Sequence, residues 1–273
     1  MSVTATLVER PPPRARGWPR SRVIGYAMVG FWILFGLGIV TYLIFAWNAD
    51  FFAKYALAYL KGLQTTLLLV CISMVLGAIL SVPVAYGRMS SNRLLSGLAY
   101  CYVYFFRGTP LLVQTYLVYY GLGSFRTELQ TVGLWDFFKD AFNCGVFAFA
   151  LNTAAYQAEI LRGAIESVPR GQWEGAASLG LHKLQTLRKI ILPQALIVAL
   201  RPYGNELILM VKASAIVAII TVYDLMGQAK LAFANSFDIQ AYIWVALVYL
   251  VMVEILRHGV EWIERRITIH LKR

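Results

Sequence analysis

VIGYAMVGFWILFGLGIVTYLIFAW, residues 23–47, runs for 25 residues without a charge. A helix rises about 1.5 Å per residue, so about 20 apolar residues cross the hydrocarbon core of a bilayer. A secretory signal peptide has a shorter apolar region followed by a cleavage site of small residues. The stretch therefore predicts a membrane-spanning helix that is retained in the mature protein.

The composition of the whole chain agrees with a membrane protein. Of the 273 residues, 59% are hydrophobic and 14% are charged, whereas soluble domains are about 45–50% apolar and about 25% charged. The mean hydropathy is +0.62. One soluble core cannot hide this apolar surplus, so the bilayer is the expected solvent.

Further apolar segments follow the first one. We expect spans at residues 62–86, 94–121, 141–160, 191–222 and 241–258. The third and fifth are interrupted by charges and prolines, namely Arg107, Pro110, Pro193, Arg201, Pro202, Glu206 and Lys212. Such breaks are tolerated at membrane depth only where protein or an aqueous cavity covers them. The pattern predicts an all-α, polytopic transmembrane bundle.

The distribution of basic residues predicts the orientation. With six spans and the N-terminal tail in the cytoplasm, 17 Lys and Arg residues fall on the cytoplasmic side, five fall outside and three lie within spans. Cytoplasmic loops carry such an excess. Both termini are therefore predicted to be cytoplasmic.

The net charge of +11 has the same origin, because the basic residues are scattered between apolar runs. We expect no nucleic acid partner. Cys71, Cys101 and Cys144 stand singly, without the paired spacing of a metal site, so we expect no metal. Asp224 and Asp238, in the last outer loop, are expected to be solvated acids.

The loop between the fourth and fifth spans reads VPRGQWEGAASLGLHKLQTLRKIILP, residues 168–193. Glu174 is expected near a helix start, where a carboxylate suits the dipole. Gly180 is expected to end that helix in a left-handed turn, and Pro193 to open the fifth span. Two short helices meeting at a glycine predict a compact knob; the alternative is an ordinary amphipathic connector.

The spacing in this loop resembles the EAA loop of ABC importer permeases. Glu174, Gly180 and Pro193 match the family pattern, whereas Gly175 stands where the family usually has alanine. The resemblance implies that the knob docks on an ATPase subunit and transmits its closure. The residues it assigns to coupling are Trp173, Glu174, Gly175, Ala176, Ala177, Gly180 and Pro193.

Further motifs resemble permeases for polar amino acids. They are FRGTPLLVQ at 106–114, GLQTT at 62–66, NTAAYQAEILRG at 152–163 and VPRGQ at 168–172. The resemblance implies the type I ABC importer permease fold, with a five-helix core and one extra N-terminal helix. The expected organisation is a basic tail at 1–22, an additional helix at 23–47, a permease domain at 62–265 containing the coupling loop, and a basic tail at 266–273.

Polar residues in the fourth span are candidates for the substrate pathway. Asn152, Tyr156 and Glu159 share a helical face, and Arg162 lies three residues beyond Glu159. One interpretation is that Glu159 meets a cationic group of the substrate. The other is that Glu159 and Arg162 only neutralise each other.

The break in the third span provides further candidates. Arg107, Thr109 and Gln114 surround a bend that is expected to expose unsatisfied carbonyls, because Pro110 removes a donor. In transporters such breaks commonly lie beside the substrate. The alternative is that Arg107 snorkels or pairs with an acid such as Glu206.

The fifth span carries a charged face made by Arg201, Asn205, Ile208 and Lys212. This face lines the pathway or packs against a second permease subunit, because it cannot face lipid. We keep Asn205 and Lys212 as pathway candidates.

The sequence contains no Walker-type phosphate-binding motif and no catalytic set. The resemblance implies a translocation subunit that is not itself an enzyme and binds no cofactor, with ATP and Mg²⁺ held by a partner. The implied partners are an ATPase dimer, a second permease subunit, an external solute-binding protein, an amino acid substrate and membrane lipid. The competing interpretations are a gradient-driven secondary transporter, and a membrane enzyme or channel.

Overall fold

The computed structural model describes residues 19–45 and 47–271, and this part of the chain contains helices and no strand. The predicted all-α class is therefore confirmed. The chain divides into two compact units, residues 1–51 and 52–273, which are described separately. Most of the predicted basic tail, residues 1–18, lies outside the described residues, as do residues 46, 272 and 273.

The first unit is dominated by helix α1 (Arg20–Phe45), which covers most of the predicted span at 23–47. Its 26 residues make a helix of about 39 Å at 1.5 Å per residue. Leu43 is its one buried side chain within the described residues, and aromatic residues such as Phe31 and Trp32 are exposed. An apolar helix without a buried face is suited to lipid.

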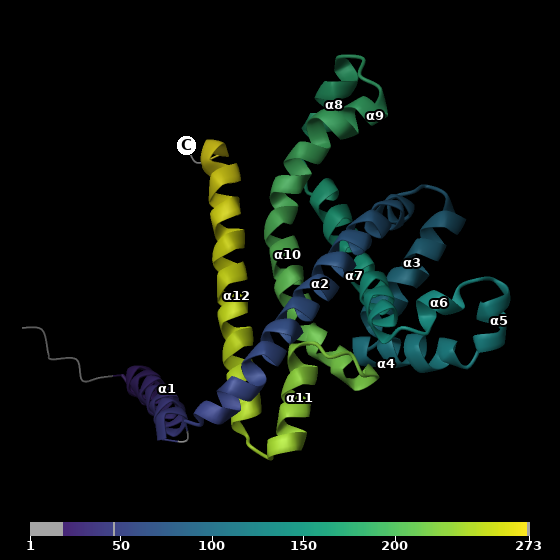
Figure 1. Cartoon of the computed structure of the whole chain (residues 1–273). Coiled ribbons are helices and arrows are strands. Elements are labelled where there is room, and N and C mark those ends of the chain that lie inside the picture. The colour runs from purple at the N-terminus through teal and green to yellow at the C-terminus, as the bar shows by residue number, and fades with distance from the viewer. Residues whose placement is uncertain (1–18, 46, 272–273) are drawn as a thin grey trace, which may run out of the picture. The chain divides into compact units, whose positions relative to one another are not determined.

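Helix α2 (Ala49–Arg88) begins in the first unit and continues through the second (Figure 1). It starts 13 residues before the predicted span at 62–86 because Lys54 and Lys61 end the apolar run without breaking the helix. The Asn48 side chain accepts a hydrogen bond from the Phe51 amide at 3.1 Å and supports the helix start.

The predicted third span, residues 94–121, is interrupted as expected. Helix α3 (Arg93–Gly108) ends before Pro110, and α4 (Leu111–Tyr116) and the π-type turn η1 (Leu117–Gly121) follow. Two short helices, α5 (Arg126–Thr131) and α6 (Trp135–Phe138), lead to the next long helix. After α6, Lys139 binds Asp136 at 2.6 Å, and this hydrogen bond lowers the pKa of the exposed carboxyl.

Helix α7 (Ala141–Glu166) is the central helix of the second unit and is six residues longer than the predicted span. Many of its alanine side chains are buried, and Ala148, Ala154 and Ala158 are fully enclosed by neighbouring residues. Small residues let neighbouring helices approach closely. On α2, Gly77 serves the same purpose, because a Cβ there would overlap the Thr153 side chain.

The predicted coupling loop forms helix α8 (Arg170–Ser178), helix α9 (Lys183–Thr186) and the π-type turn η2 (Leu187–Ile191). The turn runs directly into α10 (Leu192–Ala213), which is followed by the 3₁₀ segment η3 (Ser214–Ile220). In Figure 1 α8 and α9 lie beyond the end of α10, at one end of the second unit.

The last helices are α11 (Leu225–Ser236) and α12 (Gln240–Ile267), which ends in the 3₁₀ turn η4 (Thr268–Leu271). Helix α12 packs beside α10, where a Cβ on Gly204 would overlap Val260. The helix continues past the predicted end of the span at residue 258, so the region predicted as a tail from residue 266 is helical up to Leu271.

Four helical stretches of the described residues are long and apolar enough to cross a membrane: Arg20–Phe45, Ala49–Arg88, Lys183–Ile220 and Gln240–Ile267. The predicted third span differs because Pro110 divides it. Helix α7 has sufficient length, but polar residues such as Asn152 and Gln157 dilute its apolar character. The structure thus supports a multi-pass membrane protein.

Candidate functional site in the membrane bundle and its coupling loop

The break between α3 and α4 is closed by side-chain amides. Gln114 Nε2 donates to the Phe106 carbonyl at 2.9 Å, to the Thr109 carbonyl at 3.1 Å and to the Thr109 hydroxyl at 2.8 Å. Asn152 Nδ2, from α7, donates to the same Phe106 carbonyl at 2.9 Å and to Gln114 Oε1 at 3.0 Å. The expectation of unsatisfied carbonyls is therefore wrong for Phe106 and Thr109.

Gln114 and Asn152 are both buried, so they hold the break rather than face an open cavity. Thr109 is half-buried, and its hydroxyl donates to the Phe105 carbonyl at 2.8 Å. Three pathway candidates from two separate spans thus form one network. Its geometry fixes where the bend lies and in which direction the residue before it points.

That residue is Arg107, whose guanidinium lies over the ring of Tyr156 at 5.1 Å from the ring centre. Arg107 is exposed within the chain and Tyr156 is half-buried. No direct ion pair joins Arg107 to Glu206 in the described part of the chain, but the positive charge of Arg107 acts on the Glu206 carboxyl through space. The predicted alternative is thus found as a longer-range charge interaction and not as a contact. An aromatic face attracts a cation without neutralising it, which leaves the charge available.

Glu159 lies between two arginines. Its Oε1 accepts from Arg88 Nε of α2 at 2.8 Å, and its Oε2 accepts from Arg162 Nη2 at 2.8 Å. The predicted Glu159–Arg162 pair is confirmed, and the Arg88 contact is one that sequence spacing did not indicate. Arg162 also binds Glu166 at 2.7 Å. Arginine side chains thus bind both carboxylate oxygens of Glu159. Contact between Glu159 and the substrate stays a prediction.

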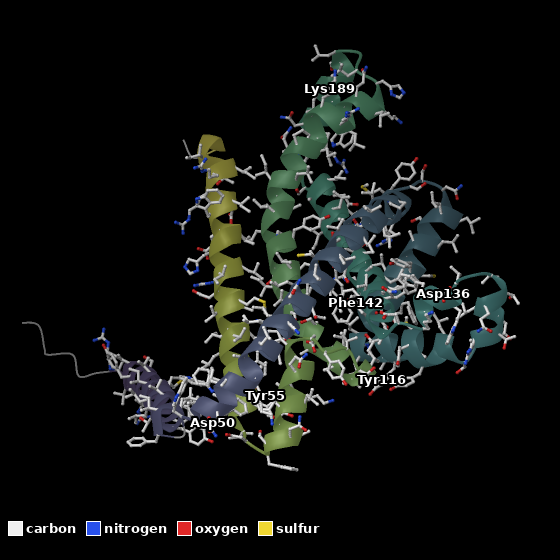
Figure 2. The ribbon with its side chains drawn as sticks, in the orientation of Figure 1. Asp50, Tyr55, Tyr116, Asp136, Phe142 and Lys189 are labelled. Carbon is white, nitrogen blue, oxygen red and sulfur yellow. The ribbon has the colours of Figure 1, made fainter. Side chains whose placement is uncertain are left out.

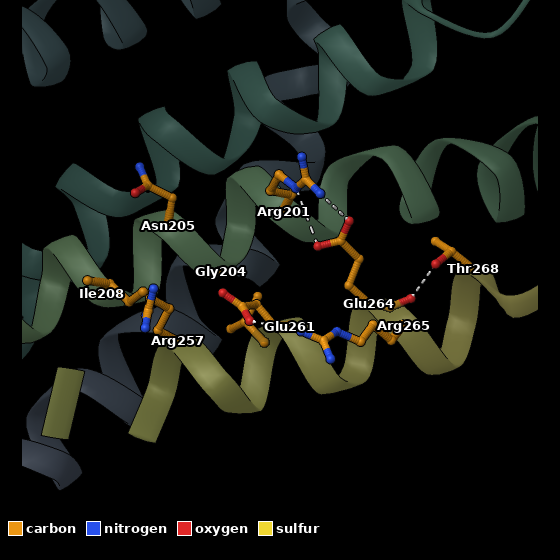
Figure 3. Close-up of a pocket in the computed structure, with 10 residues that line it drawn as sticks. Arg201, Gly204, Asn205, Ile208, Arg257, Glu261, Glu264, Arg265 and Thr268 are labelled. Carbon is orange, nitrogen blue, oxygen red and sulfur yellow. Dashed lines mark hydrogen bonds and ion pairs between the residues drawn. The ribbon is translucent and has the colours of Figure 1, made fainter. Parts of the chain in front are cut away.

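The charged face of α10 borders a groove between α10 and α12 of about 530 Å³ (Figure 3). Arg201, Asn205 and Ile208 line it from α10, and Arg257, Glu261 and Glu264 are among the residues that line it from α12. Arg201 Nη2 binds Glu264 Oε1 across the groove at 2.6 Å. Lys212, the last member of the predicted face, is exposed beyond the groove.

Glu206 is a buried acid that the sequence interpretation treated only as a partner for Arg107. Its side chain accepts a hydrogen bond from Thr153 of α7 at 2.9 Å, and it is 5% exposed. Thr153 also accepts from Gln157 at 3.1 Å, and Gln157 donates to the Met74 carbonyl of α2 at 3.2 Å. Since these residues come from three helices, sequence spacing could not place them together.

Asp224 is also buried, which makes the expectation of a solvated acid wrong. It accepts from the Gly227 amide at 2.8 Å as the cap of α11, and from the Tyr249 hydroxyl at 3.3 Å. The signal for the cap was present in the sequence, because Asp is preferred before a helix start.

The loop at residues 168–193, which was predicted to couple to an ATPase, forms the predicted knob. At the end of α8, Gly180 adopts a φ of +71°, its amide donates to the Ala177 carbonyl at 2.9 Å, and the Leu181 amide donates to the Ala176 carbonyl at 3.1 Å. This pair of bonds is the Schellman arrangement that glycine favours. The predicted left-handed turn is confirmed, and α9 follows after a short connection.

The inner side of the knob packs against the membrane bundle. Ala176 is 3% exposed, and Trp173 packs against a cluster that includes Ile165 and Val168 of the α7 end and Ile191 of the turn before α10. Glu174, Gly175 and Ala177 are exposed. One side of α8 is therefore fixed to the membrane bundle, while the other side is exposed. Lys189 of η2 lies at the same end of the second unit (Figure 2).

Two details of the loop differ from expectation. Glu174 is the fifth residue of α8 and lies outside its first turn, so the predicted benefit from the helix dipole is wrong. Pro193 is the second residue of α10, but the chain is already helical before it. Proline cannot donate the backbone bond to the residue four positions earlier, and the π-type turn η2 lies directly before α10 at this point.

Comparisons with known proteins agree with this arrangement. The family model described as the binding-protein-dependent transport system inner membrane component matches residues 73–269. The chain is 44% identical over 192 residues to the nopaline transport system permease protein NocM of Agrobacterium fabrum, covering 70% of this chain and 80% of that protein. It is 37% identical over 187 residues to the arginine ABC transporter permease protein ArtM of Haemophilus influenzae, covering 68% and 82%.

Solved structures show the same fold. An amino acid ABC transporter crystallised with histidines matches with a TM-score of 0.70 and 36% identity, covering 80% of this chain and 99% of that chain. The MetNI methionine ABC transporter matches in fold with a TM-score of 0.65 at 20% identity. These findings support the ABC permease interpretation over a gradient-driven transporter. The chain belongs to the family of inner membrane components of binding-protein-dependent transport systems.

Proposed function

We propose that this chain is the translocation subunit of an ATP-driven importer for polar amino acids of the basic or opine type. The relatives named for nopaline and arginine support this substrate class. The chain would bind no nucleotide itself, and ATP with Mg²⁺ would act in a separate ATPase dimer. A second permease subunit and an external solute-binding protein would complete the complex.

The observation that carries this proposal is the knob formed by α8 and α9. Its outer side offers Glu174 and Ala177, while Trp173 and Ala176 fix its inner side to the ends of α7 and α10. A surface element with one free side and one anchored side transmits force when a partner grips it. The knob would face the cytoplasm, with both chain termini on that side, as the excess of basic residues indicates.

The solute pathway would run beside the break at Pro110 and along the charged face of α10. Arg107, held over Tyr156, would attract a carboxylate of the solute. Asn205 and Lys212 would continue the path on α10, since a charged face at membrane depth requires water or protein beside it. Thr109, Gln114 and Asn152 would keep the break in shape.

Reconstitution with the cognate ATPase and solute-binding protein tests the proposal. The wild-type complex is expected to import at least one of arginine, glutamine, octopine and nopaline in an ATP-dependent manner. Glu174→Arg is expected to leave the permease in the membrane and to abolish solute-stimulated ATPase activity. The control Gln130→Arg places the same side chain on exposed α5 and is expected to behave like the wild type. Unchanged stimulation in Glu174→Arg would refute the coupling role.

A further inference from the structure

A chain of charged side chains with alternating sign connects α2 with the residues that precede α8. Arg88 Nε binds Glu159 Oε1 at 2.8 Å, Arg162 Nη2 binds Glu159 Oε2 at 2.8 Å, and Arg162 Nη1 binds Glu166 Oε2 at 2.7 Å. We call these four residues the charge chain. Glu166 is the last residue of α7, and α8 begins four residues later.

Arg88 is the point at which three helices meet. It is the last residue of α2, it binds Glu159 of α7, and its guanidinium lies over the Tyr100 ring of α3 at 5.0 Å. The side chains of Arg88 and Glu159 are 18% and 14% exposed. Shielded charges are screened less by salt than exposed pairs, so this contact is more than a surface ion pair.

Three members of the charge chain lie in the last part of α7, next to the residues that contact the knob. Ile165 and Val168 are buried against Trp173, so displacement of α8 acts directly on the end of α7. Arg162 of α7 itself binds both Glu159 oxygens, whereas Arg88 of α2 binds Oε1 alone, at 2.8 Å. Rotation of α7 therefore displaces Arg88 or breaks the bond between the two helices. Coupling between distant sites requires such a contiguous set of contacts.

We propose, resting on the proposed function, that Arg88 is a positioning residue: through its bond to Glu159 it makes α2 and α3 move with α8. Contacts nearer the middle of α2, such as Gly77 against Thr153, keep the helices together. They are closely packed and include the hydrogen bond from Gln157 to the Met74 carbonyl, and they lie 11 or more residues before Arg88 along α2. The Arg88–Glu159 bond determines whether the ends nearest the knob move as one body.

The test measures ATP hydrolysed per solute imported by the reconstituted complex, using a solute from the panel above that the wild type imports. Arg88→Gln is expected to raise this ratio about fivefold or more, the lower range of coupling between sites, with the complex still assembled. Arg88→Lys keeps the charge and is expected to remain close to the wild type. The matched control Lys139→Gln breaks an exposed ion pair with Asp136 and should leave the ratio unchanged.

An assembled Arg88→Gln complex with the wild-type ratio would overturn this inference alone. Failure of the wild type to import with ATP would instead refute the proposed function. If Arg88→Gln does not assemble, Glu159→Gln decides, because it removes the negative charge that Arg88 binds: a raised ratio supports the inference, and the wild-type ratio overturns it.

Glu159→Gln separates the positioning role from contact with the solute. Because both carboxylate oxygens bind arginines, Glu159→Gln is expected to raise the ATP hydrolysed per solute imported, as Arg88→Gln does. Slower import of the same solute at the wild-type ratio would assign Glu159 to the solute and overturn its place in the charge chain.

Discussion

Asn152 and Gln114, 38 residues apart on two different helices, share the carbonyl of Phe106 and also bind each other at 3.0 Å. Two buried amides thus replace the backbone bonds that Pro110 removes. A broken helix at membrane depth is stable only when its free backbone groups find such partners. The bend is therefore a fixed feature that presents Arg107, rather than a flexible one.

Gln114→Leu should destabilise the permease by about 1–3 kcal/mol, because it leaves buried carbonyls with fewer donors. Asn152→Ala should act similarly. The double variant should lose less than the sum of the two, since residues in one network couple by about 0.5–3 kcal/mol. Thermal unfolding of the purified protein in detergent measures all three.

The control for this cycle is Gln130→Leu. Gln130 is exposed on α5, so the change should alter stability by no more than about 0.5 kcal/mol. Strict additivity of Gln114→Leu and Asn152→Ala would show that the two amides act independently, against the network described above.

The contact between Arg107 and Tyr156 leads to a second prediction. Arg107→Met should reduce uptake about tenfold or more, because it removes the proposed hydrogen bond between the guanidinium and a solute carboxylate, and bonds to charged groups contribute about 1.5–3 kcal/mol. Tyr156→Leu removes the ring that positions the guanidinium and should reduce uptake by a smaller factor. Uptake into proteoliposomes at a low solute concentration measures both.

Tyr156→Phe is the informative control, since it keeps the ring face and loses only the hydroxyl. Its uptake should match the wild type. If Tyr156→Phe is as impaired as Tyr156→Leu, the hydroxyl and not the ring is what the pathway needs, and the cation–π account of Arg107 is wrong.

A third prediction concerns the contact between α10 and α12. A Cβ at Gly204 would overlap the side chain of Val260, and overpacking of this kind typically costs about 1–3 kcal/mol. Gly204→Ala should therefore lower the unfolding temperature of the permease. At Gly259 of α12 no atom lies within 4 Å of the added Cβ, so Gly259→Ala should be neutral or stabilising. Equal effects at both positions would contradict the close packing.

The sequence predicted the features that depend on neighbouring residues. The length of apolar runs located α1, α2 and α12, and Gly180 located the end of α8, because membrane crossing and helix termination are largely local. Pro110 likewise predicted where the third span breaks. The extra helical residues at the ends of α2, α7 and α12 were missed because charged residues end an apolar run without ending a helix.

Features that depend on packing between helices could not be predicted. Arg88 and Glu159 lie 71 residues apart, so no spacing rule connects them, and Glu159 with Arg162 looked like a self-contained pair. The same holds for Thr153 and Glu206, 53 residues apart. A charge within an apolar run signals that a partner must exist, but only the packed bundle identifies the partner.

The last prediction compares two glycines of the same short helix region. Gly180 needs its left-handed backbone, with a φ of +71°, to end α8, and a side chain in that conformation costs about 1–2 kcal/mol. Gly175 is helical, and no atom lies within 4 Å of an added Cβ. There alanine should stabilise the helix by up to about 1 kcal/mol. The two substitutions are chemically identical, so they isolate the role of backbone conformation in the knob.

Hydrogen exchange measures the difference directly. The Gly180 and Leu181 amides bind the Ala177 and Ala176 carbonyls. Their exchange should quicken about 5–30-fold in Gly180→Ala, the factor that corresponds to one or two kcal/mol, and should slow in Gly175→Ala. Solute-stimulated ATPase activity should fall only in Gly180→Ala, because a frayed knob transmits less of the movement of its partner. If exchange quickens in Gly180→Ala while stimulation is unchanged, the knob does not need its closed turn to couple, and the contact must reside in the exposed side of α8 alone.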